Sequence, residues 1–119
     1  MKEDFLHYLW KVGKFDMRNL TTVSGEKLHI IRPGVHNENA GPDFLNAKIK
    51  IGDIIWEGHV EIHLLASDWE AHQHQHDQAY NTVILHVVLE SDQTVLMKNN
   101  QPMPTLELKD RIPAGVLGR

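Results

Sequence analysis

The sequence predicts an α+β domain with a mixed central sheet. A segment near the N-terminus has apolar side chains at helical spacing, and two strand patterns are joined by a two-residue turn. A helix-capping motif then precedes an apolar run of the kind that forms buried strands. The predicted order is helix, strand, strand, strand, helix and strand, with a β extension. These elements cover residues 3–12, 26–32, 43–51, 54–65, 68–80 and 82–90.

The first helix is expected over residues 3–12. Acidic residues occupy its first turn, and Gly13 follows the last residue of the periodic pattern, as is typical of a helix end. Its apolar face consists of Phe5, Leu6, Leu9 and Trp10. The strand at 26–32 then ends at a Pro-Gly pair, and a polar loop leads to Asp43.

The next two strands are expected to form a hairpin around Gly52-Asp53, a two-residue turn signal. Pairing Ile51 with Ile54 places Leu45 opposite Val60 and gives a consistent apolar face.

The second helix is expected to run from Asp68 to Tyr80. Ser67 stands at the cap position and Glu70 follows three residues later, which is the pattern of a capping box. The apolar run TVILHVVLE comes next and is typical of a central strand.

The length of 119 residues suits one domain with one core. We expect an α+β core over residues 1–101 and a poorly packed tail over 102–119. The tail has few apolar residues among its prolines and glycines, so they need a partner surface. A second copy of the chain or a missing C-terminal part is expected to supply that surface.

Composition narrows the functional classes. Twelve Lys and Arg against sixteen Asp and Glu give a net charge of -4, which disfavours a general polyanion binder. The absence of cysteine excludes a disulfide scaffold, a thiolate zinc site and a cysteine nucleophile. Nothing resembles a signal peptide or a membrane span, so we expect a cytoplasmic protein without a membrane partner.

Histidine is the compositional anomaly, with 9 in the chain. Five are clustered in one stretch: His59, His63, His72, His74 and His76.

The strand at 54–64 carries the first group of ionisable residues. Because side chains alternate between the faces of a strand, Glu57, His59, Glu61 and His63 are expected on one face. Carboxylate and imidazole two residues apart form a half-site for a divalent cation. The alternative is a solvated polar face.

The other histidines lie in the predicted second helix and the strand after it. His72 and His76 stand four residues apart, so on a helix they can chelate a metal, with His74 on the opposite side. The alternative is again a solvated face. His86 lies within the apolar strand, and we expect it to be buried beside a carboxylate rather than to bind a metal.

The run NENAGPDFLNAKIKIGDIIWEGHVEIHLLASDWEAHQHQHDQAYNTVILHVV, together with FLHYLW near the start, resembles an uncharacterised bacterial family, domain of unknown function 2851. AGPDF, VEIH, SDW, HxH and the LHVV strand occur in the same order. The resemblance implies that the chain is the N-terminal module of a longer protein. It implies no activity.

The same residues more remotely resemble the core of PD-(D/E)xK nucleases, with its helix, three strands, helix and strand. Pro42-Asp43 resembles the first motif, and Glu61-Ile62-His63 the second, with histidine in the place of lysine. The resemblance implies a metal-dependent phosphodiesterase acting on nucleic acid, with Asp43 and Glu61 as metal ligands and His63 as the base that positions water. Mg²⁺ or Mn²⁺ suits the carboxylates, and Zn²⁺ is a further candidate because of the imidazoles.

Two further assignments remain open. His59 or His72 is expected as a secondary ligand or a phosphate contact. A non-nuclease metal-binding domain would instead use His72 and His76. From a different class, the alternative is a catalytically silent binding or scaffold module that contacts the missing C-terminal part.

A strict register places Asp43 and Glu61 on opposite faces of the sheet. A bulge at Gly58 would bring Asp43 across from His63, on the side of Glu61. The functional interpretation therefore predicts a bulge in this strand.

Overall fold

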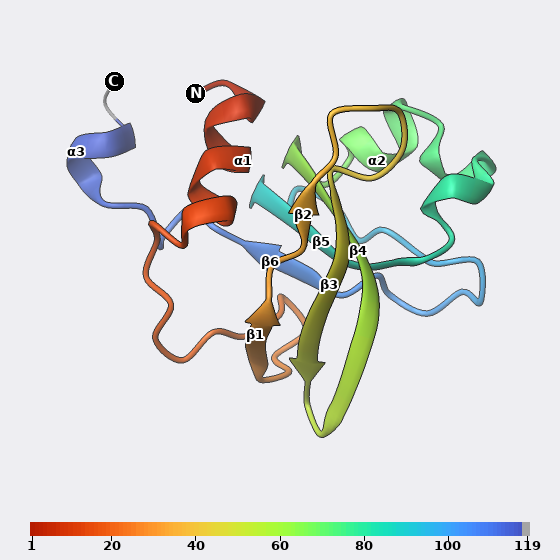
Figure 1. The fold of residues 1–119 in the computed structure, drawn as a ribbon, viewed down its shortest axis with the longest axis horizontal. Coiled ribbons are helices and arrows are strands. Elements are labelled where there is room, and N and C mark those ends of the chain that lie inside the picture. The colour runs from red at the N-terminus through yellow and green to blue at the C-terminus, as the bar shows by residue number, and fades with distance from the viewer. Residues whose placement is uncertain (118–119) are drawn as a thin grey trace.

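The computed structural model describes residues 1–117, with the side chain of residue 117 left aside, and it has the predicted α+β architecture with a mixed sheet (Figure 1). The strands are β1 (Leu28–Arg32), β2 (Val35–His36), β3 (Phe44–Ile51), β4 (Ile54–Leu65), β5 (Val83–Glu90) and β6 (Thr105–Glu107). The helices are α1 (Glu3–Val12), α2 (Asp68–Ala71) and α3 (Ala114–Leu117), with the 3₁₀ turns η1 (His74–His76) and η2 (Gln78–Tyr80).

The sheet order is β1-β3-β4-β5-β6, with β2 beside β3 at one end. Strands β1, β3 and β4 pair in antiparallel fashion, whereas β5 is parallel to both β4 and β6. The β3–β4 hairpin extends beyond the rest of the sheet (Figure 1). The mixed sheet is therefore confirmed, and the predicted elements occur in the predicted order, with the two-residue strand β2 added in a segment that was expected to be a loop.

Helix α1 covers one face of the sheet. Its predicted bounds are confirmed, and Gly13 ends it in the left-handed conformation with a φ of 71°. Leu6, Leu9 and Trp10 are buried in the main apolar core, and the Trp10 indole donates a hydrogen bond to the Pro33 carbonyl. The apolar stripe read from the sequence therefore anchors this helix.

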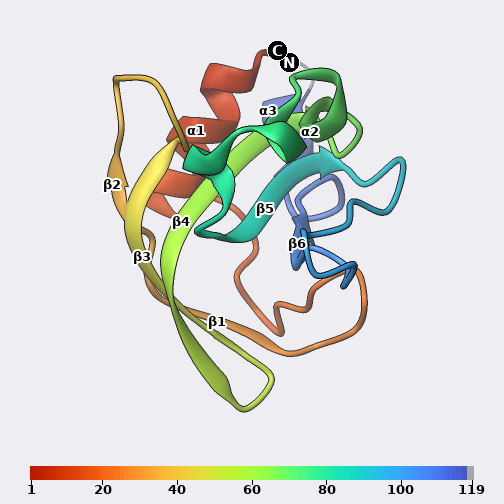
Figure 2. The same ribbon diagram turned by 90° about the vertical axis from the view of Figure 1, so that its right-hand side faces the viewer.

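The opposite face is covered by the segment from α2 to η2 (Figure 2). Trp69 is buried there in a second, smaller core with Val88 and Met103. The predicted continuous helix over 68–80 is wrong, because Gln73 adopts a left-handed φ of 62° and divides it into one short helix and two 3₁₀ turns.

The register of the β3–β4 hairpin is confirmed near the turn, where Ile51 pairs with Ile54. Farther along it differs from the prediction, because Phe44, and not Leu45, lies opposite Val60. The extra residue therefore lies in β3, where Asn46 has a φ of 60°. The predicted bulge exists, but in β3 rather than at Gly58 of β4.

Gly58 has a different role in the sheet. A Cβ atom added at this position would lie 2.5 Å from Ile84 Cγ2 and 2.6 Å from the Thr82 carbonyl oxygen. The β4–β5 register also shifts here, since His59 pairs with Val83 while the next residue pairs with Leu85. The glycine therefore permits the close approach of the two strands.

The C-terminal segment is packed more closely than expected. Leu106 and Leu108 are fully buried and Ile112 nearly so, and all three belong to the main core. These three side chains find their partner surface within the chain, because β6 pairs with β5 and completes the sheet. Residues 118–119 lie outside the described residues. Within the described chain, no helix is long and apolar enough to cross a membrane.

Candidate metal centre

Glu61 and His63 lie on the same face of β4, as the alternation predicts. Both side chains are buried, with residue exposures of 4% and 1%. Glu61 Oε2 lies 3.3 Å from His63 Nε2. The two earlier residues of the predicted polar face are less buried than Glu61 and His63. Glu57 is exposed near Lys48, and His59 is only half-buried. The ionisable face is thus a buried site at one end and a solvated surface at the other.

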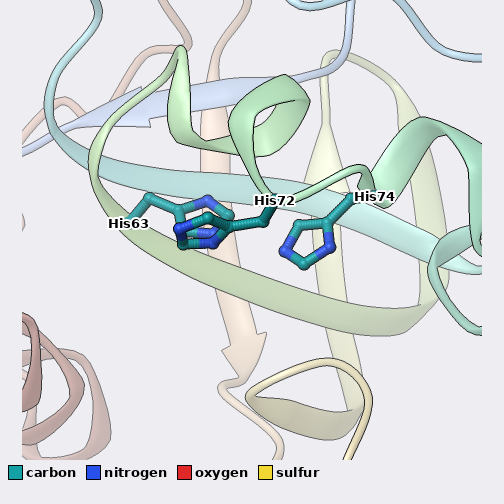
Figure 3. Close-up of side chains that lie close together, drawn as sticks. All are labelled: His63, His72 and His74. Carbon is teal, nitrogen blue, oxygen red and sulfur yellow. The ribbon is translucent and has the colours of Figure 1, made fainter.

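The segment after α2 adds two histidines to this site. His74 is buried, and its Nε2 atom lies 2.8 Å from Glu61 Oε2. His72 is exposed, and its ring centre lies 5.1 Å from that of His63 and 5.6 Å from that of His74. The three imidazoles meet between β4 and the segment that follows α2 (Figure 3). Their ligating nitrogens all lie within 4.8 Å of one another.

The geometry of this group could accommodate a metal ion. Nε2 of both His63 and His74 is buried without a hydrogen-bond partner in the described chain, despite the nearby Glu61 oxygen. Two ligands bound at ~2.0–2.2 Å to one ion, at tetrahedral or octahedral angles, lie roughly 2.8–3.6 Å apart. The two distances to Glu61 Oε2 fall within this range. An ion would therefore satisfy nitrogens that the protein leaves unpaired.

His86 of β5 contacts the ring nitrogen of His63 that faces away from Glu61. His63 Nδ1 lies 2.7 Å from His86 Nε2, and His86 is fully buried. Burial is as predicted, but the partner is an imidazole and not a carboxylate. If His63 offers Nε2 to an ion, its Nδ1–H donates to His86 and fixes the ring orientation.

Asp43 reaches Glu61 because of the bulge in β3. The Asp43 backbone N–H donates to Glu61 Oε1 at 3.1 Å, and the Ile62 N–H donates to Asp43 Oδ2 at 2.8 Å. The predicted placement on the side of Glu61 is thus observed. The predicted alignment with His63 is wrong, because the extra residue lies in β3 and brings Asp43 opposite Glu61.

Burial controls the charge state of the site. It lowers the pKa of His63 to about 4 and that of His86 to about 3, and it also lowers the pKa of His74. These imidazoles are therefore neutral at pH 7 and have free lone pairs for a cation. Burial and the neighbouring Asp43 raise the pKa of Glu61, so this carboxyl group holds a proton until a cation replaces it.

A family model described as "Protein of unknown function (DUF2851)" matches residues 3–119. The chain belongs to this family. No curated protein and no solved structure matches it. The family resemblance read from the sequence is confirmed, whereas the nuclease resemblance has no support from a matching protein.

Two other histidines that were predicted as metal ligands, His59 and His76, lie outside the group formed by His63, His72 and His74. His59 Nδ1 accepts the Asn46 N–H at 3.1 Å and so satisfies the β3 bulge. His76 is exposed at the end of η1, and without a continuous helix it does not form the predicted i, i+4 pair with His72.

Sequence reasoning placed His74 away from the site, although it makes the shortest contact with Glu61. The available signal was the alternation of histidine and glutamine over 72–76, which is unusual for a solvated helix.

Two cavities of the DUF2851 chain differ in their relation to these residues. A cavity of about 300 Å³ is lined by Trp69, His74 and Tyr80, so it reaches one histidine of the candidate metal-binding group. The Tyr80 ring stacks on His74, with ring centres 3.7 Å apart. A larger cavity of about 990 Å³ between α1 and the C-terminal segment contains none of the histidines. Of these two cavities, the smaller one therefore borders the candidate site.

Proposed function

We propose that this chain is a metal-dependent hydrolase whose ion is held by Glu61, His63, His72 and His74. One observation carries the proposal: the buried Nε2 atoms of His63 and His74 both approach the same Glu61 oxygen and have no hydrogen-bond partner in the described part of the chain. Neutral imidazoles and a carboxylate are a common donor set for catalytic metals.

The donor set favours some metals over others. Three imidazoles and one carboxylate suit Zn²⁺, Mn²⁺ or Fe²⁺ better than Mg²⁺, which prefers oxygen ligands. We therefore expect Zn²⁺ to bind most tightly.

A bound divalent ion would polarise a substrate oxygen and lower the pKa of a bound water. The protein residues orient the ligands for this chemistry. The Asp43 N–H holds Glu61 Oε1 and so directs Oε2 toward the histidines, and His86 holds His63. His72 is exposed and marks the side from which substrate and water reach the site.

A phosphodiester of nucleic acid is the proposed substrate class. The order of the elements and the position of Asp43 beside Glu61 support this substrate class through the PD-(D/E)xK resemblance. Histidine in the place of lysine leaves the site without a fixed positive charge. Together with the net charge of -4, this predicts weak substrate binding.

A second candidate function is a binding or scaffold module. The specific observation in its favour is the exposure of three apolar side chains on the protruding β3–β4 hairpin, namely Ile54, Ile55 and Trp56. A second copy of the chain, or a C-terminal part of a longer protein, would be the partner.

The test is hydrolysis of bis(p-nitrophenyl) phosphate and of single-stranded DNA at low ionic strength, with Zn²⁺ or Mn²⁺ added to chelator-treated protein. We expect activity that EDTA removes and that Glu61→Gln and His74→Ala each reduce by at least ~10²-fold. The matched control is His29→Ala, which changes an exposed histidine on β1 and should retain full activity. Metal-loaded protein that hydrolyses neither substrate would refute the hydrolase proposal.

A further inference from the structure

We infer that Glu3, His7 and Asp43 form a second divalent-cation site, beside the first one and at the N-terminal end of α1. Their ligating atoms all lie within 4.8 Å of one another. His7 Nε2 is 3.7 Å from Glu3 Oε1 and 3.6 Å from Asp43 Oδ2. The function proposed above does not involve Glu3 or His7.

Local structure explains how these three side chains meet. Glu3 and His7 are four residues apart on α1, so they lie on one face of the helix. Asp43 is brought to the same place by the β3 bulge, and its other contact, with the Ile62 N–H, holds the carboxylate still. The site therefore depends on the packing of α1 against the end of the sheet.

The contacts leave room and need for a cation. His7 Nε2 is buried without a hydrogen-bond partner among the residues described, and both carboxylates lie just beyond hydrogen-bonding distance from it. These separations are close to the roughly 2.8–3.6 Å expected for ligands of one ion. The side chains are 16% to 38% exposed, so an ion can enter from solvent.

The donor set differs from that of the first site. Two carboxylates and one imidazole are a harder set than three imidazoles and one carboxylate, so this site favours Zn²⁺ over Mn²⁺ less strongly than the first site does, and Mn²⁺ is expected to bind here once Zn²⁺ fills the first site. Glu3 and Asp43 raise the pKa of His7, so a cation that binds here displaces a proton from the imidazole.

The two sites are linked through Asp43 and Glu61. Glu61 directs Oε2 toward His63 and His74, while its Oε1 accepts the backbone N–H of Asp43. Two ions would therefore lie on either side of this carboxylate pair. This inference deepens the proposed function, since the pair of ions rests on the first site, but the Mn²⁺ site itself can be tested separately.

The test is Mn²⁺ binding to purified chain preloaded with one equivalent of Zn²⁺, followed by electron paramagnetic resonance and isothermal titration calorimetry. We expect one additional Mn²⁺ per chain, and a loss of at least ~10-fold in its affinity in His7→Gln and in Glu3→Gln. Glu3→Gln changes an accessible residue at the start of the helix, so it keeps the test valid if His7→Gln fails to fold. The control is Asp4→Asn, which removes one charge from the same turn at an exposed position and should bind Mn²⁺ as the wild type does.

The outcomes separate the two proposals. Wild-type protein that takes up Zn²⁺ but no Mn²⁺, or Mn²⁺ affinity equal in His7→Gln, Glu3→Gln and wild type, overturns the second site and leaves the first intact. Mn²⁺ binding that depends on His7 in a chain that binds no Zn²⁺ supports the second site and refutes the first.

Discussion

Gly58→Ala tests the packing that holds β4 against β5 beside the site. The new methyl group would lie 2.5 Å from Ile84 Cγ2 and 2.6 Å from the Thr82 carbonyl oxygen. The Ile84 side chain can rotate, but the carbonyl cannot retreat without weakening its 2.9 Å hydrogen bond from the His59 N–H. The clash therefore requires movement of backbone.

The size of the effect follows from these contacts. Overpacking typically costs about 1–3 kcal/mol, and we expect the upper part of this range because backbone must move. An alanine restricts the unfolded chain and offsets about 0.4–1 kcal/mol of that, which leaves a net destabilisation of about 2 kcal/mol. For a domain of this size this corresponds to a fall in Tm of roughly 8 °C.

The assay is urea unfolding monitored by circular dichroism, together with thermal melting. Gly115→Ala is the matched control, because a Cβ atom there meets no other atom of the described residues within 4 Å, so only the restriction of the unfolded chain remains and this variant should be as stable as the wild type or up to about 1 kcal/mol more stable. A Gly58→Ala protein as stable as this control would refute the close approach of the two strands.

Five further predictions address the site and the core. In metal-free protein the pKa of His63 is about 4, below the ordinary value of 6.5, so the unfolded chain takes up a proton before the folded chain does as the pH falls. Up to about 3 kcal/mol of the stability present above pH 6.5 should therefore be lost by pH 4. Urea unfolding in EDTA measures this loss. The raised pKa of Glu61 acts in the opposite sense and lowers stability as the pH rises above 4.5, so Glu61→Gln should be the more stable protein at pH 8. His86→Leu should keep the fold but weaken Zn²⁺ binding by about 10–100-fold in competition titrations, because His63 loses its orienting partner; unchanged affinity would contradict that role. Asn46→Val should cost about 1–2 kcal/mol and Asn46→Gly almost nothing, since only the valine resists a φ of 60°. Leu106→Ala should cost about 2–5 kcal/mol in chemical unfolding, and a value below about 1 kcal/mol would mean that β6 is a loose tail after all.

Much of the fold could be predicted because its signals are local. The apolar stripe of α1, the Gly52-Asp53 turn and the apolar run of β5 depend on neighbours a few residues away, and all three are confirmed. The burial of Glu61 and His63 on one face also follows from the period of a strand.

The remainder depends on contacts between distant segments. The position of the β3 bulge is set by Asn46, whose left-handed conformation is satisfied by His59 across the sheet. No glycine or proline in the sequence indicates the helix break at Gln73. This break turns His74 toward Glu61 instead of away from it. The burial of the C-terminal segment required knowledge that β6 pairs beside β5. In each case tertiary structure overrides a reasonable local preference.

Anomalous diffraction at the zinc edge, on crystals grown with Zn²⁺, tests the metal centre most directly. We predict one strong peak per chain at ~2.0–2.2 Å from Glu61 Oε2, His63 Nε2 and His74 Nε2. His72 is expected to be the fourth protein ligand. A peak confined to exposed histidines such as His29 or His76, with no density between Glu61 and the two buried imidazoles, would contradict it.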